Sequence, residues 1–262
     1  MNPIIEIRDI KVIRGGVEVL DIPNLTIQEG QIVSVIGPNG SSKSTLLLTL
    51  ACLLPRFQGD IFFKGKPLCS KEDQFQYRRK MAMVFQEPLL FDTTVFKNVA
   101  SGLKIRGVNR KMIPDKVNYY LNQLGITHLS NRSARKLSGG EAKRTSLARA
   151  FALEPEILFL DEPFTALDPP THDMLIHDLK RILGETQKTA IMATHDLLEA
   201  IRISHHIVVM NQGKVIQQGT PQTIVDHPAN TFVSDFMNRF FQAYRDLGLM
   251  KENKLINIIS NF

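Results

Sequence analysis

The segment that most constrains the fold of this chain runs from a short apolar strand through a glycine-rich loop into a helix. The strand is predicted over Gln31–Ile36 and the helix over Ser44–Leu54. Backbone N–H groups of such a loop, together with the helix N-terminus, can surround a chain of phosphates. Lys43 would then reach the phosphate oxygens and Ser44 would hold Mg²⁺, although the loop alone also fits an ordinary glycine turn. The loop residues are Gly37, Pro38, Asn39, Gly40, Ser41, Ser42, Lys43, Ser44 and Thr45.

One position of the loop departs from the strict phosphate-binding pattern, which has glycine directly before the lysine. Ser42 stands there and adds a side chain where the backbone usually approaches phosphate or takes a positive φ. If Ser42 is left-handed, that conformation costs roughly 1–2 kcal/mol. Ser42→Gly is then predicted to tighten nucleotide binding.

Two further segments place polar groups where an anion or a metal can bind. The apolar strand Ile157–Leu160 ends at Asp161 and Glu162, which supply one carboxylate for water-mediated Mg²⁺ binding and one to orient an attacking water. The alternative is that Asp161 only caps the next helix. Leu137–Glu141 begins a helix with two glycines, so its N–H groups and hydroxyl can face an anion, or it is simply an N-cap.

The pattern along the whole chain predicts an α/β fold. Ile4–Val12 and Val17–Ile27 alternate around a Gly-Gly turn, so the chain is expected to begin with an antiparallel sheet. Later strands, such as Thr189–Thr194, alternate with helices and favour a mainly parallel sheet with ligands along one edge. We divide the chain into one domain over 1–230, with an inserted helical subdomain at about 88–146, and a C-terminal helix and tail over 231–262. That last helix is predicted over Phe232–Gly248.

Length, composition and cysteine spacing indicate the size of the domain and the compartment in which the chain is found. At 262 residues and 43% hydrophobic, it can bury the core of one substantial α/β domain. Its apolar runs fall far short of the roughly 20 residues that a membrane-spanning helix needs. The N-terminus lacks the apolar core of a signal peptide, and Cys52 and Cys69 lack metal or redox spacing, so we expect a cytoplasmic chain with reduced thiols.

Positive charge is concentrated in one part of the chain, which carries a net charge of +6 overall. Between Phe75 and Ser146, basic residues greatly outnumber acidic ones. This segment is either a solvated helical face or a surface that lies near membrane headgroups.

Several of these motifs follow one another in a fixed order. They are Gly37–Thr45, Gln86, Leu137–Glu141, Asp161–Glu162, Ala166–Asp168 and His195. In this order the chain resembles the nucleotide-binding subunits of ATP-binding-cassette (ABC) transporters, over nearly its whole length. The resemblance implies a RecA-like P-loop NTPase core with a mainly parallel sheet, an N-terminal antiparallel β subdomain and an inserted α-helical subdomain.

The resemblance also implies roles for residues that bind ATP and Mg²⁺ in their own copy. Lys43 and Mg²⁺, with Ser44, Gln86 and Asp161 as metal-site residues, would stabilise charge during phosphoryl transfer. Glu162 would act as the catalytic base or orient the water. Taken alone, Gln86 would be an ordinary polar residue.

The remaining residues of the site would come partly from a second copy and partly from the same copy. The resemblance implies that Ser138 and Gly140 contact the γ-phosphate held by the partner and that Asp168 touches the partner. Gly139 between them is counted among the nucleotide-binding residues. His195, which alone would more often be structural, would contact the γ-phosphate of its own site. The active site would therefore be divided between the two chains of a homodimer.

Two positions depart from the family pattern. The family usually stacks adenine on an aromatic ring near the first turn, where this sequence has Ile13 and Arg14. The guanidinium of Arg14 could stack on the base, or the base could be held loosely. Lys143 stands where glutamine is common, and the sequence predicts no effect for it.

The resemblance implies an integral membrane permease as partner, docked near Phe91–Phe96, and indirectly an extracytoplasmic substrate-binding protein. The chain would lie at the cytoplasmic face of the membrane, with no nucleic acid bound. Leu90–Phe96 and Arg132–Glu141 are similar to tungstate-uptake subunits, which favours an oxyanion importer, although import or export stays open. The alternatives are a transporter for another solute, a soluble nucleic-acid- or ribosome-associated ATPase and a non-hydrolysing interaction module.

Overall fold

The computed structural model describes residues 2–55 and 57–246, which form two compact units. Within those ranges, the first unit combines 2–55 and 57–67 with 191–246, and the second is 68–190. The chain therefore leaves the first unit, completes the second and returns. Among the described residues, no helix has both the length and the apolar character needed to cross a bilayer.

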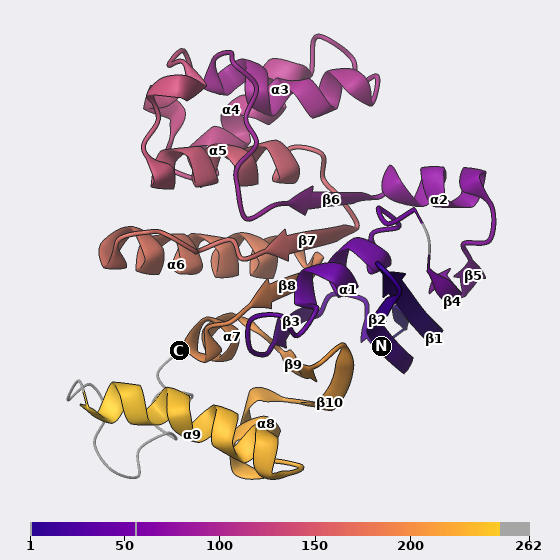
Figure 1. Cartoon of the computed structure of the whole chain (residues 1–262). Coiled ribbons are helices and arrows are strands. Elements are labelled where there is room, and N and C mark those ends of the chain that lie inside the picture. Colours follow the sequence, from indigo (N-terminus) through magenta and orange to yellow (C-terminus); the bar gives the residue numbers. More distant parts are fainter. Residues whose placement is uncertain (1, 56, 247–262) are drawn as a thin grey trace. The chain divides into compact units, whose positions relative to one another are not determined.

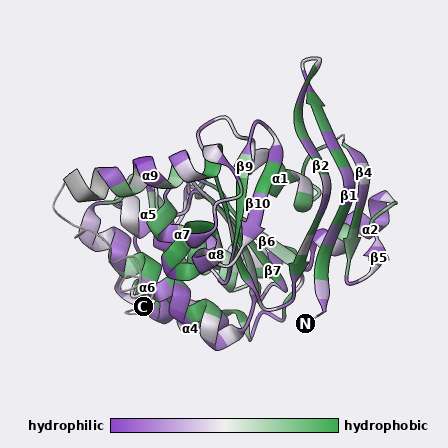
Figure 2. Ribbon diagram, turned by 90° about the horizontal axis from the view of Figure 1, so that it is seen from below, coloured by the Kyte–Doolittle hydropathy of each residue, from purple (hydrophilic) through white to green (hydrophobic). Residues whose placement is uncertain are grey.

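An antiparallel sheet opens the first unit. β1 (Pro3–Arg14) and β2 (Val17–Gln28) pair in register Ile7↔Leu25 around a turn in which both glycines have positive φ. β4 (Gln58–Phe63) pairs with β1, and β5 (Lys66–Pro67) completes the order β2-β1-β4-β5. Figure 2 shows hydrophobic and hydrophilic residues alternating along β1 and β2, the pattern of a sheet with one buried face. The predicted antiparallel start is confirmed.

The rest of the first unit surrounds β3. Its strands and helices are β3 (Ile32–Ile36), α1 (Lys43–Leu50), α7 (Leu197–Ile203), β9 (His206–Asn211), β10 (Lys214–Gly219), α8 (Pro221–Asp226) and α9 (Thr231–Asp246). β3 pairs in parallel with β9, and β9 in antiparallel with β10. One core cluster joins Ile36 of β3 to Leu197 of α7 and to Val233 and Met237 of α9. α9 confirms the predicted C-terminal helix as far as 246, while Gly248 lies outside the described residues.

The second unit is mostly helical (Figure 1). Its elements are α2 (Lys71–Arg78), β6 (Met81–Val84), α3 (Val95–Ile105), α4 (Ile113–Gln123), two 3₁₀ turns (Thr127–Leu129 and Ala134–Lys136), α5 (Gly139–Phe151), β7 (Ile157–Asp161) and α6 (Pro169–Thr186). β6 and β7 are parallel, and the Tyr120 ring stacks on Phe151 between α4 and α5. β8 (Thr189–Thr194) crosses the division between the units. The boundaries of the predicted helical subdomain stay a prediction.

The helix after the glycine-rich loop is shorter than predicted. It ends at Leu50, not Leu54, because Cys52 takes a left-handed conformation at φ 51°. A left-handed residue ends a helix, and it is usually glycine or asparagine. Cysteine gives no such signal in the sequence.

Candidate functional site

The glycine-rich loop lies between β3 and α1 in the first unit. The Lys43 side chain is buried, and its ammonium donates hydrogen bonds to the carbonyl oxygens of Gly37 (2.9 Å) and Pro38 (3.2 Å). α1 begins at Lys43 and has no acidic residue in its first turn. A cation and the positive end of a helix therefore meet at the loop, as phosphate binding requires.

Two left-handed residues shape the loop. Gly40 has φ 80°, and Ser42 has φ 72° and ψ 25°. The Ser42 side chain makes no capping hydrogen bond to α1 within the described residues. The condition for strain at Ser42 is therefore met, since the left-handed conformation costs a non-glycine residue about 1–2 kcal/mol.

The first glycine of the loop packs against the β9–β10 hairpin. A Cβ on Gly37 would lie 2.2 Å from the Met210 carbonyl oxygen, so only glycine fits. In the hairpin turn, Gly213 donates its N–H to the Ser41 carbonyl (3.3 Å) and accepts one from Asp21 of β2 (2.9 Å). The loop is thus positioned by a hairpin made late in the chain.

His195 follows β8, and β8 is the neighbour of β3 in the strand order. The His195 side chain is exposed, but the backbone around it is fixed. Thr194 donates its hydroxyl to the buried Glu199 carboxylate (2.5 Å) and accepts the N–H of Asp196 (3.0 Å), whose own carboxylate caps α7. The structure therefore places His195 and the glycine-rich loop, called the phosphate loop below, after neighbouring strands of the same unit.

The tip of the β1–β2 hairpin carries Arg14, which pairs with Val17 and is exposed. Ile13 and Val17 are also exposed at this tip, at 56% and 63%. The tip presents an apolar surface beside a guanidinium plane. Both are chemically suited to a base, and the adenine contact of Arg14 stays a prediction.

In the second unit, the parallel strands β6 and β7 deliver the other catalytic candidates. Val84 is in register with Leu160, so Gln86 and the pair Asp161–Glu162 follow the strands at the same edge. Glu162 has φ 47°, an uncommon conformation for a residue with a side chain. Its carboxylate accepts a hydrogen bond from the Thr165 hydroxyl at 3.2 Å. The structure therefore brings Gln86, Asp161 and Glu162 to one edge of the second unit, and their catalytic roles stay a prediction.

The start of α5 fixes the glycine pair of the third motif. Ser138 is the N-cap, its hydroxyl accepts the N–H of Glu141 (3.3 Å), and its own N–H donates to the Glu141 carboxylate (2.7 Å). This reciprocal pair is a capping box. The hydrogen bond from the Ser138 N–H is the main reason why the pKa of Glu141 lies below its ordinary value.

Asp168 has the helix-capping role that was the alternative interpretation of Asp161. It is the N-cap of α6, where its carboxylate accepts the N–H of Thr171 (3.1 Å), and that bond lowers the pKa of Asp168. Asp161, the residue considered as a cap, instead ends β7. Asp168 also lines a hollow of about 260 Å³ that is bordered by Ser138, Gly139 and Gly140. The structure thus brings together the residues predicted to face a partner.

One residue of this region was named in the sequence analysis without a predicted effect. Lys143 of α5 is 8% exposed, and its ammonium donates to the backbone carbonyls of Gln86 (3.0 Å) and Glu162 (3.2 Å). Arg144 beside it is also buried and pairs with Asp178 at 2.5 Å. The basic segment is therefore not entirely a solvated face, and no spacing in the sequence could have indicated these long-range contacts.

The chemistry of these groups fits Mg²⁺ and a nucleoside triphosphate. In the first unit, the Lys43 ammonium, the α1 N-terminus and the hydroxyl of Ser44 suit phosphate oxygens and a hard cation. In the second unit, the Asp161 carboxylate and the Gln86 amide are oxygen donors of the kind Mg²⁺ prefers.

Comparison with known proteins gives a consistent result. A family model described as "ABC transporter" matches residues 20–165. The chain is 39% identical over 234 residues to a sulfate/thiosulfate import ATP-binding protein, CysA, of Nephroselmis olivacea, covering 89% of this chain and 67% of the relative. It is also 39% identical over 231 residues to a spermidine/putrescine import ATP-binding protein, PotA, of Fusobacterium nucleatum subsp. nucleatum, covering 87% and 61%.

Solved structures agree with these sequence matches. CbiO1 from Clostridium perfringens, part of the ABC transporter complex cbiONQ, has a TM-score of 0.80 at 29% identity, over 95% of this chain and 100% of that one. A dimeric ATP-binding cassette in a post-hydrolysis state, bound to ADP and Pi, has a TM-score of 0.75 at 27% identity, over 83% and 98%. The predicted α/β fold with its antiparallel N-terminal sheet is confirmed.

Proposed function

This chain belongs to the ABC transporter family, and from that we infer that it is the motor subunit of an import system, working as a homodimer beneath a membrane permease. It is an ATPase that uses ATP with Mg²⁺. Import is supported by the two relatives named above, both of which are import ATP-binding proteins. The proposed location is the cytoplasmic face of the membrane.

The observation that carries the catalytic proposal is the shared edge of β6 and β7. Gln86 and the pair Asp161–Glu162 follow these parallel strands at the same edge. We assign Glu162 the role of orienting or deprotonating the attacking water, and Gln86 and Asp161 that of holding Mg²⁺. Bound Mg²⁺ would neutralise charge on the transferring phosphate.

The remaining roles are divided between two copies. Lys43 would bind the β- and γ-phosphates, Ser44 the metal, and His195 the γ-phosphate. Ser138 and its glycines would reach the γ-phosphate of the other copy. Ser138 and Gly139 are exposed at the start of α5, beside the exposed Asp168, which supports this assignment because a partner can approach them.

The test is Mg²⁺-ATP hydrolysis by the purified chain across a wide range of protein concentration. A rate that rises faster than linearly at low concentration supports the divided site. Glu162→Gln should lower the rate by about 10²–10⁴-fold while nucleotide still binds. A rate strictly proportional to concentration, or one that survives in Glu162→Gln, contradicts the assignment.

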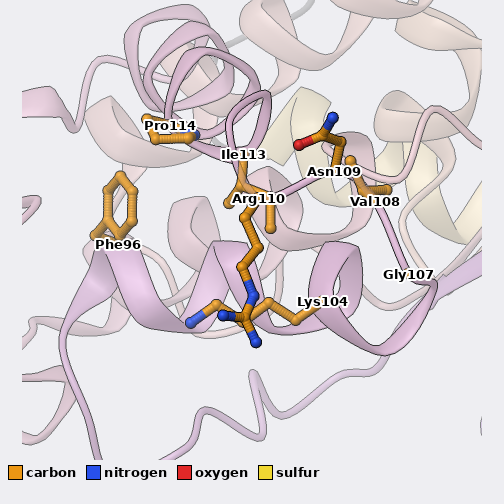
Figure 3. A pocket seen from close by; sticks show the side chains of 8 residues that line it. All are labelled: Phe96, Lys104, Gly107, Val108, Asn109, Arg110, Ile113 and Pro114. Carbon is orange, nitrogen blue, oxygen red and sulfur yellow. The ribbon is translucent and has the colours of Figure 1, made fainter.

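The permease is proposed to dock on the second unit near Phe91–Phe96. Leu89 and Phe91 are exposed apolar residues, at 58% and 56%, and Arg149 holds this segment by donating to the carbonyls of Pro88 and Leu89, both at 2.9 Å. A neighbouring hollow of about 730 Å³ is lined by the apolar side chains of Phe96 and Ile113 and by the cations Lys104 and Arg110 (Figure 3). A permease helix with an apolar side and an acidic residue would fit both features.

The transported solute is proposed to be an oxyanion, and tungstate is the finer proposal. The CysA relative supports an oxyanion by its name, whereas the PotA relative favours a second candidate, a polyamine. Vesicles that contain the chain with its permease and binding protein should take up tungstate in competition with sulfate or molybdate. Uptake of spermidine alone would contradict the oxyanion proposal.

A further inference from the structure

Lys143 is a buried cation that reaches two separate loops. It lies in the second turn of α5 and is 8% exposed. Its ammonium donates to the Gln86 carbonyl at 3.0 Å and to the Glu162 carbonyl at 3.2 Å. A lysine ammonium has three donors on a single nitrogen, so one atom can hold two carbonyls at once.

The two carbonyls belong to the residues that follow β6 and β7. The register of those two strands runs to Val84↔Leu160, and Lys143 contacts the backbone two residues beyond each of these positions. Lys143 supplies one contact common to both loops. Hydrogen bonds from a charged donor are stronger than those between neutral groups. The two bonds from the buried Lys143 ammonium are therefore expected to hold the loops firmly.

Of the two residues, Glu162 has the less common backbone conformation. It has φ 47°, and its carbonyl accepts hydrogen bonds from the Thr165 hydroxyl (3.2 Å) and the Thr165 N–H (3.4 Å) as well as from Lys143. An uncommon backbone conformation persists only where the surroundings fix it. The direction of the Glu162 side chain therefore depends on donors gathered at its own carbonyl.

We propose that Lys143 is a positioning residue that holds the Gln86 and Glu162 loops in one arrangement, so that both side chains are presented together to the nucleotide and the attacking water. It touches neither, and it acts through the two backbones. The proposal rests on the catalytic roles assigned above to Gln86 and Glu162. A glutamine at this position is shorter and uncharged, and would not reproduce the same pair of bonds.

The experiment compares Lys143→Met, which keeps most of the apolar stem but has no ammonium, with Lys143→Arg, which keeps a cation. In Lys143→Met, kcat should fall by about 10- to 100-fold while KM for ATP stays within about twofold. Hydrogen exchange of the full chain without nucleotide should become faster in both 84–92 and 159–167. Lys143→Arg should restore most of kcat and the slow exchange.

Lys80→Met is the matched control, because Lys80 forms an ion pair with Glu156 that is largely exposed, and it should change neither kcat nor exchange in the two loops. Wild-type kcat in Lys143→Met, or faster exchange in only one loop, overturns the proposal. If Lys143→Met does not fold, Lys143→Gln takes its place with the same criteria. Failure of the catalytic roles is separate, since it would appear as full activity in Glu162→Gln.

Discussion

The phosphate loop and the α5 start are both expected to contact phosphate, but different forces shape them. The shape of the phosphate loop is determined mainly by its backbone conformation. Gly37 has no room for a Cβ, and Gly40 and Ser42 are left-handed. The start of α5 is held instead by side-chain hydrogen bonds, which come from the capping box of Ser138 and Glu141 and from the ammonium of Lys143. A substitution in the first region acts through strain, whereas one in the second acts through lost hydrogen bonds.

The largest expected effect is at Gly37. Gly37→Ala places a Cβ 2.2 Å from the Met210 carbonyl oxygen, so the loop or the hairpin must move. We expect a loss of about 2–4 kcal/mol in the free energy of unfolding, together with lost nucleotide binding. Denaturant unfolding and calorimetry measure both. Gly184→Ala in α6, where a Cβ meets nothing within 4 Å, is the control and should not destabilise the chain.

Ser42→Gly should act in the opposite direction. Glycine removes the cost of the left-handed conformation, about 1–2 kcal/mol, less what glycine gains in unfolded-chain entropy. Thermal stability should therefore rise and nucleotide affinity increase. Ser42→Ala keeps the strain and removes only the hydroxyl, so it should not reproduce the gain. Equal or weaker affinity in Ser42→Gly would show that strain at this residue does not affect binding.

Ser138→Ala tests the side-chain mechanism of the second region. Losing the N-cap should cost about 1 kcal/mol of stability. Because Ser138 is also proposed to contact the partner's nucleotide, hydrolysis should fall by more than this cost explains. Thr220→Ala removes a similar cap from α8, where Thr220 accepts the Thr223 N–H at 3.2 Å, and should lower stability alone. Equal activity in the two variants would remove the contact role of Ser138.

The smallest expected effect is an acid-dependent loss at the two capped helices. Hydrogen bonds lower the pKa of Glu141 and of Asp168, so the folded state favours both carboxylates. This stability is present above the ordinary pKa values of about 4.3 and 3.9, and is lost as the pH falls through the lower folded values. Thermal stability should thus be insensitive to these groups between about pH 5 and 7. The double variant Glu141→Gln with Asp168→Asn should lose less thermal stability than the wild type as the pH falls below about 4.

The sequence predicted those parts of the fold that local patterns determine. Alternation gave β1 and β2, and the glycine-rich loop was placed correctly before α1. α2 was missed although Ser70 and Asp73 form a capping box, which is a readable signal. The end of α1 gave no such signal, because a cysteine takes the left-handed position there.

The candidate site was predictable as a set of residues but not as an arrangement. Motif order placed Gln86 and Glu162 in one site, but their common contact with Lys143 depends on how α5 packs on the ends of β6 and β7. Asp168 could have been identified as a helix cap from the two prolines that follow it, which suit the first turn of a helix. Contacts between distant segments leave no trace in spacing.

The hairpin that supports the phosphate loop sets an order of events during synthesis. The loop leaves the ribosome early, yet the backbone that packs on Gly37 belongs to Met210, and the turn that bonds Ser41 and Asp21 belongs to Gly213. A Cβ on Gly213 would meet the Val19 carbonyl oxygen at 2.5 Å, so that turn sits directly on β2. The whole second unit is made in between. The contacts that hold the glycine-rich loop in place can therefore form only after β9 and β10 have been synthesised.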